Sequence, residues 1–305
     1  MKKFLRHIMT GGMPVSEYST VTVPIRIHEK VMLEVKGHTM DISTVHWLLC
    51  LQPVIFGIWF SKEHVNTYAK QHSVYKIIFK DSEKHNKTTA DLRLEYFTEI
   101  AEGDGILLLL RLSKASVHHI HLIRTRYLFY RHYKKPEQDF QILKSFAAAY
   151  SYPRRVRLIS FSDNIFPMDL VGDIPDTKRY VFGLRHTNIS LPGIMETKKL
   201  VVSEVPYHYK DVIYQLGKHH QKRLLDFPVL FDFVESEIFG FPVPDWCNSY
   251  KEIRIVKTIS LGSHMLLWGE EINEKSLNAS MGHLFHIHFL HFLHQKKLGN
   301  AYFLV

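Results

Sequence analysis

The chain has 305 residues, enough for one large domain or two of about 150 residues each. Its 46% hydrophobic and 23% charged residues are those of an ordinary globular protein, and its two cysteines are too few for a disulfide framework. The 39 Lys and Arg exceed the 30 Asp and Glu, giving a net charge of +9. These basic residues are scattered in pairs, which argues against nucleic acid as a partner. No apolar stretch approaches the ~20 residues of a membrane helix, so the sequence predicts a cytoplasmic protein without a membrane partner.

Short strand patterns dominate the chain. In order they fall at Val21–Ile27, Val31–Val35, Val54–Phe60, Val74–Phe79, Ile106–Leu112, His119–Tyr130, Val156–Ser160, Phe166–Asp173, Arg179–Leu184, Leu200–Val205, Ile253–Ile259, Met265–Glu271 and His286–Phe292. Helical spacing is rarer, at Lys62–His72, Gln138–Tyr150, Leu191–Lys198 and His208–Leu216. Many short strands with few helices predict a barrel with helices on its outside.

The two halves of the sequence contain similar short motifs. Phe56-Gly57 and Phe182-Gly183 each follow an apolar strand and precede a polar loop and a helix. Glycine turns and His-x-His strands recur later in the same order, at Gly103–Gly105 with His119–His121 and at Gly262–His264 with His286–His288. Motifs that recur in the same order predict a tandem duplication, with the helix near residues 138–150 linking the two copies. The alternative is that the first half is an unrelated cap.

The segment Val156–Pro206 carries the clearest chemistry. Its third strand runs into the loop Arg185–Asn188, where Arg185 offers a guanidinium fork and Thr187 a hydroxyl group. Asn188 or Ser190 is placed to cap the next helix, whose first amides also favour an anion. From residue types alone, a plain surface loop with a capping asparagine is the simpler interpretation.

Several ordered motifs in the second half resemble the flavin reductase-like, FMN-binding split-barrel family. They cover roughly residues 150–305 and are Asn164–Gly172, Phe182–Thr187, Gly193–Pro206, Phe241–Trp246, Ser249–Ile253, Val256–Thr258, Gly262–Glu270 and Lys296–Gly299. The resemblance implies a mainly β fold with flanking helices, an FMN-binding split β-barrel duplicated in tandem as a pseudo-dimer. Residues 1–145 are then a degenerate split-barrel-like or cap domain, and residues 146–305 the flavin reductase-like domain.

The resemblance also implies a cofactor and a reaction. The cofactor is FMN, or FAD in its place, and NAD(P)H is the transient reductant that transfers a hydride to the flavin. Proteins of the family dimerise with the flavin at the interface, so a homodimer or an internal pseudo-dimer is expected. Flavin and nicotinamide small molecules are the expected partners.

Site residues follow from the same resemblance. The phosphate candidates are Arg185, His186, Thr187 and Asn188, and His264 lies in a turn close to the site. The candidates for the flavin ring and ribityl chain are Ser160, Ser162, Asn164, Pro167 and Met168. Two features depart from the family pattern: Pro167 removes a backbone donor, and Asp169 adds a negative charge. In the first half, Ile58–Lys62 replaces the Arg-His-Thr-Asn pattern.

Two other functions remain open from the sequence. The departures from the family pattern favour a non-catalytic flavin-binding protein as one alternative. A metal-dependent β-barrel is the other, because His286 and His288 alternate by two and therefore share one face of a strand. The resembled family uses no metal, so no metal site is expected.

Overall fold

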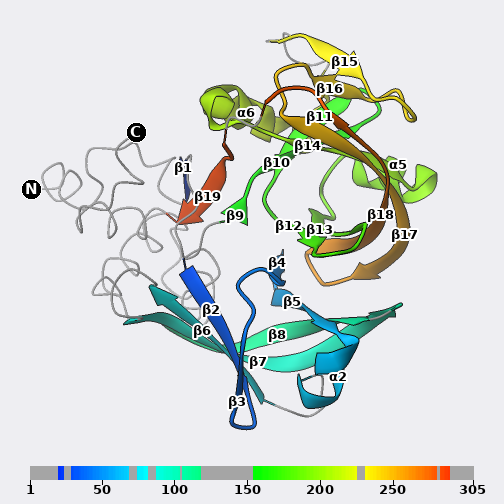
Figure 1. Cartoon of the computed structure of the whole chain (residues 1–305). Helices are drawn as coiled ribbons and strands as arrows, with labels where there is room; N and C mark the ends of the chain where they lie inside the picture. The colour runs from blue at the N-terminus through cyan, green and yellow to red at the C-terminus, as the bar shows by residue number, and fades with distance from the viewer. Residues whose placement is uncertain are drawn as a thin grey trace, which may run out of the picture.

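The computed structural model describes residues 20–23, 29–68, 74–81, 87–103, 105–117, 154–224, 231–279 and 282–288. In this part of the chain the protein is mainly β, with two seven-stranded antiparallel sheets and a few short helices, as the sequence predicts (Figure 1). The predicted strand His119–Tyr130, the predicted helix Gln138–Tyr150 and the motif Lys296–Gly299 lie outside the described residues. The predicted domain boundary between residues 145 and 146 also lies outside the described residues and stays a prediction.

The first sheet is built from residues 29–117. Its strands, in the spatial order β3-β2-β6-β7-β8-β5-β4, are β3 (His38–Asp41), β2 (Glu29–Val35), β6 (Val74–Asp81), β7 (Lys87–Glu102), β8 (Gly105–Val117), β5 (Val54–Ser61) and β4 (His46–Leu51). The helix α2 (Lys62–Tyr68) follows β5.

The second sheet is built from residues 157–276. Its strands, in the order β11-β10-β14-β17-β18-β13-β12, are β11 (Asn164–Met168), β10 (Arg157–Phe161), β14 (Lys199–Glu204), β17 (Ser249–Ser260), β18 (His264–Ser276), β13 (Arg179–Arg185) and β12 (Val171–Ile174). Around it lie α5 (Leu191–Thr197), η2 (Tyr207–Tyr209), α6 (Lys210–Leu216), η3 (Gly217–His220) and the hairpin of β15 (Phe233–Glu235) with β16 (Pro242–Pro244).

The two sheets have the same strand order when their strands are matched along the chain. β2, β3, β4, β5, β6, β7 and β8 take the places of β10, β11, β12, β13, β14, β17 and β18. α2 follows β5 as α5 follows β13. Phe56-Gly57 and Phe182-Gly183 lie on the matching strands β5 and β13, which is the arrangement that a tandem duplication requires.

Strand β5 shows why its sequence is apolar almost throughout. Phe56, Ile58 and Phe60 pack into the core of the first half. Ile55, on the opposite face, packs into a cluster shared with the second half, against residues that include Val181 and Trp268. A strand with both faces covered has no solvent side, so its sequence runs apolar instead of alternating.

The predicted strand Phe166–Asp173 is wrong in one respect, because the chain breaks it at Asp169 and Leu170. β11 pairs with β10 on one edge of the sheet, whereas β12 pairs with β13 on the other edge. The two residues between them carry the chain from one edge to the other, and the backbone N–H of Gly183 donates to the carbonyl of Leu170. An apolar pattern does not mark where a strand changes partners.

The halves meet through β4 of the first and β12 and β13 of the second, which face each other in Figure 1. Trp47 lies against Gly172, and the carbonyl of Leu49 lies against Gly183, at both of which a Cβ atom would clash. Leu170 of the second half in turn packs into the core of the first. The junction is therefore a packed core of its own.

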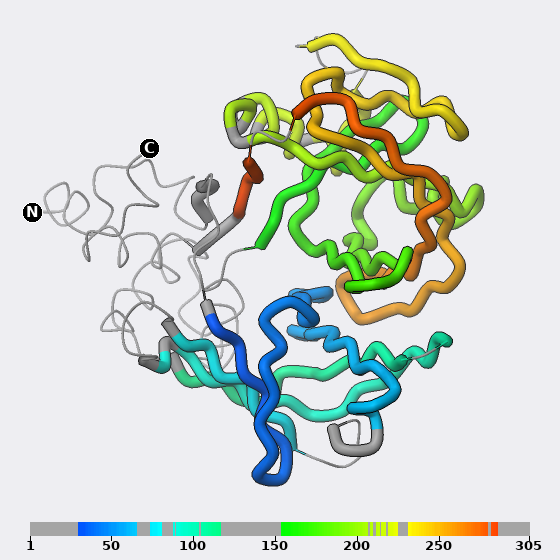
Figure 2. The backbone as a smooth tube through the Cα atoms, in the orientation of Figure 1, coloured from blue at the N-terminus to red at the C-terminus, as the bar shows by residue number. Residues whose placement is uncertain are grey.

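A third sheet ties the first and last described strands to the start of the second half. β19 (Phe285–His288) pairs with β1 (Thr20–Val23) on one side and with β9 (Arg154–Arg155) on the other. Figure 2 shows the orange-red end of the described chain returning to the green start of the second half. The predicted strands at both ends are thus present, where they fall on described residues.

Candidate functional site

Two predicted site residues meet at one edge of the second sheet. Arg185 ends β13, His264 begins β18, and the two residues are direct partners in the antiparallel register. Residues opposite each other in an antiparallel pair project from the same face. Arg185, His186 and Thr187 are exposed, whereas His264 is only 2% exposed.

The imidazole ring of His264 is neutral, and one of its nitrogens has polar contacts. Its Nδ1 lies 2.8 Å from the hydroxyl oxygen of Ser263 and 3.5 Å from the sulfur of Cys50. Its Nε2 is buried and has no hydrogen-bond partner among the described residues. Burial, followed by the nearby charge of Arg185, lowers the pKa of His264 to about 4. In the tautomer whose Nδ1 accepts from the Ser263 hydroxyl, the ring hydrogen sits on Nε2 and Nε2 is a donor, whereas the other tautomer makes Nε2 an acceptor.

The first half holds the turn that carries His264. The backbone N–H of Ser263 donates to the carbonyl of Gln52 at 2.8 Å, and the thiol of Cys50 donates to the carbonyl of Leu261 at 3.2 Å. Gly262 has a φ of +101°, and a Cβ atom there would lie 2.6 Å from the Gln52 carbonyl oxygen. A glycine is therefore required both by the backbone and by the neighbouring half.

A buried hydrogen-bond network joins two other predicted residues. Asn164 donates through Nδ2 to the hydroxyl of Ser190 and to the carbonyl of His219, both at 2.9 Å. The side chain of Asn188 accepts from the backbone N–H of Ser190 at 2.8 Å. The network fixes the loop after β13 against the start of β11, and the Oδ1 atom of Asn164 remains buried with no partner among the described residues.

One of the two predicted cap residues, Ser190, is the N-cap of the helix, but its side chain does not make the capping hydrogen bond. A proline occupies the first turn of this helix, α5. Asn188 and Ser190 use their side chains in the network with Asn164 instead. The reason is that the hydroxyl of Ser190 points back to β11, and Pro192 offers no amide hydrogen.

The remaining predicted residues have their described contacts elsewhere in the second half. Met168 packs in the core of the second barrel. Ser160 pairs with Ile165, which belongs to the cluster on the outer face of the sheet, so Ser160 faces away from that core. Pro167 lies near Gly217 outside the barrel, and Ser162 is exposed in a tight turn with a φ of +52°. None of the contacts described joins these four residues to Arg185, and their place in the site stays a prediction.

Asp169 does not present an uncompensated charge. Both Nε and one terminal nitrogen of Arg154 donate to its Oδ2, at 3.0 and 2.8 Å. The buried guanidinium neutralises the carboxylate that departs from the family pattern. No local pattern indicates this pair, because Arg154 lies in a separate short strand 15 residues earlier.

The residues at the Arg185 edge fit a phosphate-bearing group. Phosphate oxygens accept hydrogen bonds from an exposed guanidinium, from the hydroxyl of Thr187 and, in the tautomer with the hydrogen on Nε2, from the buried ring of His264. The His186 ring adds a further polar group, with its Nε2 3.4 Å from the Ser260 hydroxyl. We therefore take Arg185, His186, Thr187 and His264 as the candidate site, called the Arg185 edge below.

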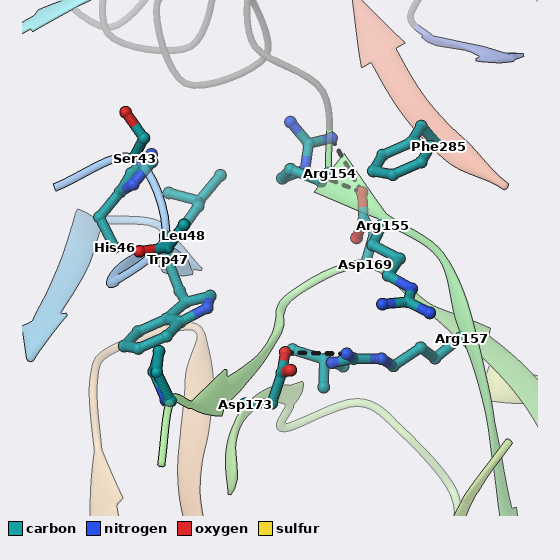
Figure 3. Close-up of a pocket in the computed structure, with 13 residues that line it drawn as sticks. Ser43, His46, Trp47, Leu48, Arg154, Arg155, Arg157, Asp169, Asp173 and Phe285 are labelled. Carbon is teal, nitrogen blue, oxygen red and sulfur yellow. Dashed lines mark hydrogen bonds and ion pairs between the residues drawn. The ribbon is translucent and has the colours of Figure 1, made fainter. Parts of the chain in front are cut away.

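A separate cavity of about 350 Å³ lies between the halves (Figure 3). None of the ten predicted site residues lines it. The first half contributes Ser43, Thr44, His46, Trp47 and Leu48, and the charged lining residues of the second half are Arg154, Arg155, Arg157, Asp169 and Asp173. Sequence reasoning missed it because its two walls come from segments more than 100 residues apart.

Neither a metal cluster nor a membrane helix is found where the chain is described. No three His, Cys, Asp or Glu residues gather as metal ligands within those ranges. The backbone of His286 and His288 lies in β19, but their side chains are outside the description. Among the described helices, none has the length and apolar character to cross a bilayer.

No protein-family model and no curated protein sequence matches this chain. Among solved structures, it is similar to an NADH:FAD oxidoreductase of Streptomyces globisporus C-1027, with 15% identity, a TM-score of 0.43, and coverage of 50% of this chain and 90% of the other. It is also similar to an FMN-binding protein of Thermus thermophilus, with 14% identity, a TM-score of 0.37, and coverage of 41% and 71%.

A flavoredoxin of Methanosarcina acetivorans is similar at 19% identity and a TM-score of 0.35, covering 41% of this chain and 69% of the other. Each match spans half of this chain or less. All three matches are to proteins that are named for flavin binding or flavin chemistry, and each has a TM-score below 0.5.

Proposed function

We propose that the chain binds FMN at the Arg185 edge and serves as a flavin-dependent oxidoreductase, with NAD(P)H as its reductant. A bound flavin supplies the redox chemistry by accepting a hydride and passing on its electrons. The protein then has to hold the phosphate, orient the ring and exclude water.

The single observation that carries the proposal is the pairing of Arg185 with His264. The exposed guanidinium and the buried Nε2 atom project from the same face of neighbouring strands. A buried donor without a partner costs free energy unless a ligand satisfies it. Because the low pKa keeps His264 uncharged at neutral pH, it would donate a hydrogen bond and not act as a general acid.

The remaining residues have supporting parts in this proposal. Arg185 supplies the charge that pairs with the phosphate, and the Asn164 network keeps the loop after β13 in place. The turn of Gln52 and Pro53 in the first half holds the backbone of Ser263, and so fixes the ring of His264. The first half would thereby play the part that a second subunit plays in a dimer.

A visible spectrum tests the proposal. We expect the purified protein, supplied with FMN and freed of excess, to be yellow, and its absorbance near the flavin band to bleach when NADH or NADPH is added without oxygen. A yellow protein that never bleaches supports flavin binding without reductase activity. A protein that takes up neither FMN nor FAD contradicts both.

A further inference from the structure

The cavity between the halves has two chemically different walls. The first half contributes Trp47 and Leu48 on one side, and Phe285 of β19 closes the rim. The second half contributes arginine and aspartate side chains on the other side, as Figure 3 shows. A volume of about 350 Å³ is within the range of small-molecule sites.

The positive and negative charges at the second-half wall cancel. Three arginines and two aspartates line this wall, and Glu204, outside the lining, supplies the third carboxylate. The ion pairs are Arg154–Asp169, Arg155–Glu204, Arg157–Glu204 and Arg157–Asp173, each at 2.8 Å. A ligand with a net charge would leave an uncompensated charge in this half-buried place, which is costly. The cavity therefore favours a ligand whose net charge is zero.

One positively charged side chain and one negatively charged side chain are accessible to such a ligand. The side chains of Arg154 and Arg157 line the cavity but are only 3% exposed, and each is held by a carboxylate. Arg155 is 29% exposed and Asp173 is 57% exposed, and Arg157 binds only the Oδ1 atom of Asp173 in the contacts described. The wall thus presents a guanidinium and a carboxylate side by side, which suits a zwitterion.

The cavity also offers apolar surface. On the first-half wall, Leu48 is buried and Trp47 is partly exposed with its ring against Gly172, beside the polar side chains of Ser43, Thr44 and His46. Phe285 is buried on the charged side, where it is the strand partner of Arg155. Aromatic and aliphatic side chains of this kind supply most of the binding free energy of small ligands by removing apolar surface from water.

We propose that this cavity binds an amphipathic zwitterion of the α-amino-acid type. Its carboxylate pairs with Arg155, its ammonium group with Asp173, and its apolar side chain lies against Trp47 and Phe285. This site is separate from the Arg185 edge and does not depend on a bound flavin.

Three related compounds test the charge requirement. We expect titration calorimetry on the full chain to show binding of L-phenylalanine. It should also show at least about tenfold weaker binding of 3-phenylpropionate, which lacks the ammonium group, and of phenethylamine, which lacks the carboxylate. Equal binding of either analogue, or no binding of L-phenylalanine, would overturn the proposal.

A matched pair of variants tests the position. Asp173→Asn should weaken L-phenylalanine binding at least about tenfold, while Asp176→Asn, the same change on an exposed turn outside the cavity, should leave it unchanged. Arg157 keeps Glu204 as a partner in the first variant, which favours folding. Should Asp173→Asn fail to fold, Thr44→Phe at the exposed rim should abolish binding by narrowing the cavity, and unchanged binding there refutes the assignment.

The flavin proposal and this one can fail independently. L-phenylalanine binding should be the same in the Arg185→Ala variant as in the parent protein. Loss of L-phenylalanine binding in that variant would show that the two sites are one and would contradict the separate cavity site.

Discussion

Arg185 and His264 are direct neighbours across two strands, yet the fold exposes the first side chain and buries the second. The difference lies in what covers them. Cys50 and the turn after it pack over His264, while nothing in the described contacts pairs a carboxylate with Arg185. An exposed cation next to a buried, uncharged donor can receive an anionic group without first breaking an ion pair.

Arg185→Ala is expected to weaken FMN binding by about 1.5–3 kcal/mol, since it removes a charge-assisted hydrogen bond to the phosphate. Fluorescence titration of FMN measures this change. Arg254→Ala, which removes an exposed arginine from β17, serves as the control and should have no effect. Unchanged affinity in Arg185→Ala removes the residue from the site.

His264 should make the stability of the protein depend on pH. Its pKa is about 4 in the folded chain and 6.5 in the unfolded chain, so the unfolded state binds more protons between these values. The stabilising contribution is complete above about pH 6.5 and is lost as the pH falls to about 4. The loss amounts to at most about 3 kcal/mol.

Urea unfolding of the parent protein and of His264→Gln at several pH values measures this contribution. The carboxylates titrate in both proteins, so the difference between them isolates His264. We expect the stability of the parent to fall more steeply than that of the variant between pH 6.5 and 4. Parallel curves would contradict the burial of a neutral ring.

At the scale of elements, β4 and β13 approach each other so closely that a side chain is excluded. A Cβ atom on Gly183 would lie 1.9 Å from the carbonyl oxygen of Leu49, in a backbone that cannot yield as a side chain tip can. Gly183→Ala should therefore destabilise the protein by about 3 kcal/mol, the upper part of the usual range for overpacking.

Gly217→Ala is the matched control, because a Cβ atom there would meet only Pro167, at 3.8 Å. We expect it to change the free energy of unfolding by less than about 1 kcal/mol. Denaturant unfolding compares the two. A similar, small effect of both changes would show that the halves do not meet as closely as described.

At the scale of the whole molecule, the matching strand order lets the two halves be compared position by position. With Gly57 matched to Gly183, the register of β5 with β8 places Trp59 where β13 has Arg185, and Leu107 where β18 has His264. The ring of Trp59 packs against that of Trp268, with centroids 6.0 Å apart. The first-half counterpart of the Arg185 edge is thus filled with apolar side chains.

One flavin per chain is therefore expected if the proposed function holds. The ratio of flavin absorbance to protein concentration after removal of excess FMN measures it. A ratio of two would contradict the loss of the first-half site. A ratio of zero contradicts the proposed function itself.

The sequence determined the local chemistry of this protein. Strand patterns predicted its mainly β class, because residues that alternate or run apolar in short stretches bury one or both faces of a sheet. The motifs around Phe182–Thr187 pointed to the loop after β13, where guanidinium and hydroxyl groups lie exposed. These features depend on residues close together in the chain, where spacing alone carries the information.

Only the tertiary structure decided the features that depend on contacts between distant segments of the chain. The fold ends the predicted strand at Asp169, because the neighbouring strand changes there from β10 to β13. It also pairs the Asp169 carboxylate with Arg154. It turned Ser190 away from helix capping and buried His264 beneath Cys50. It also formed the cavity between the halves, whose walls no local pattern relates, because burial and charge pairing depend on which distant segments the fold brings together.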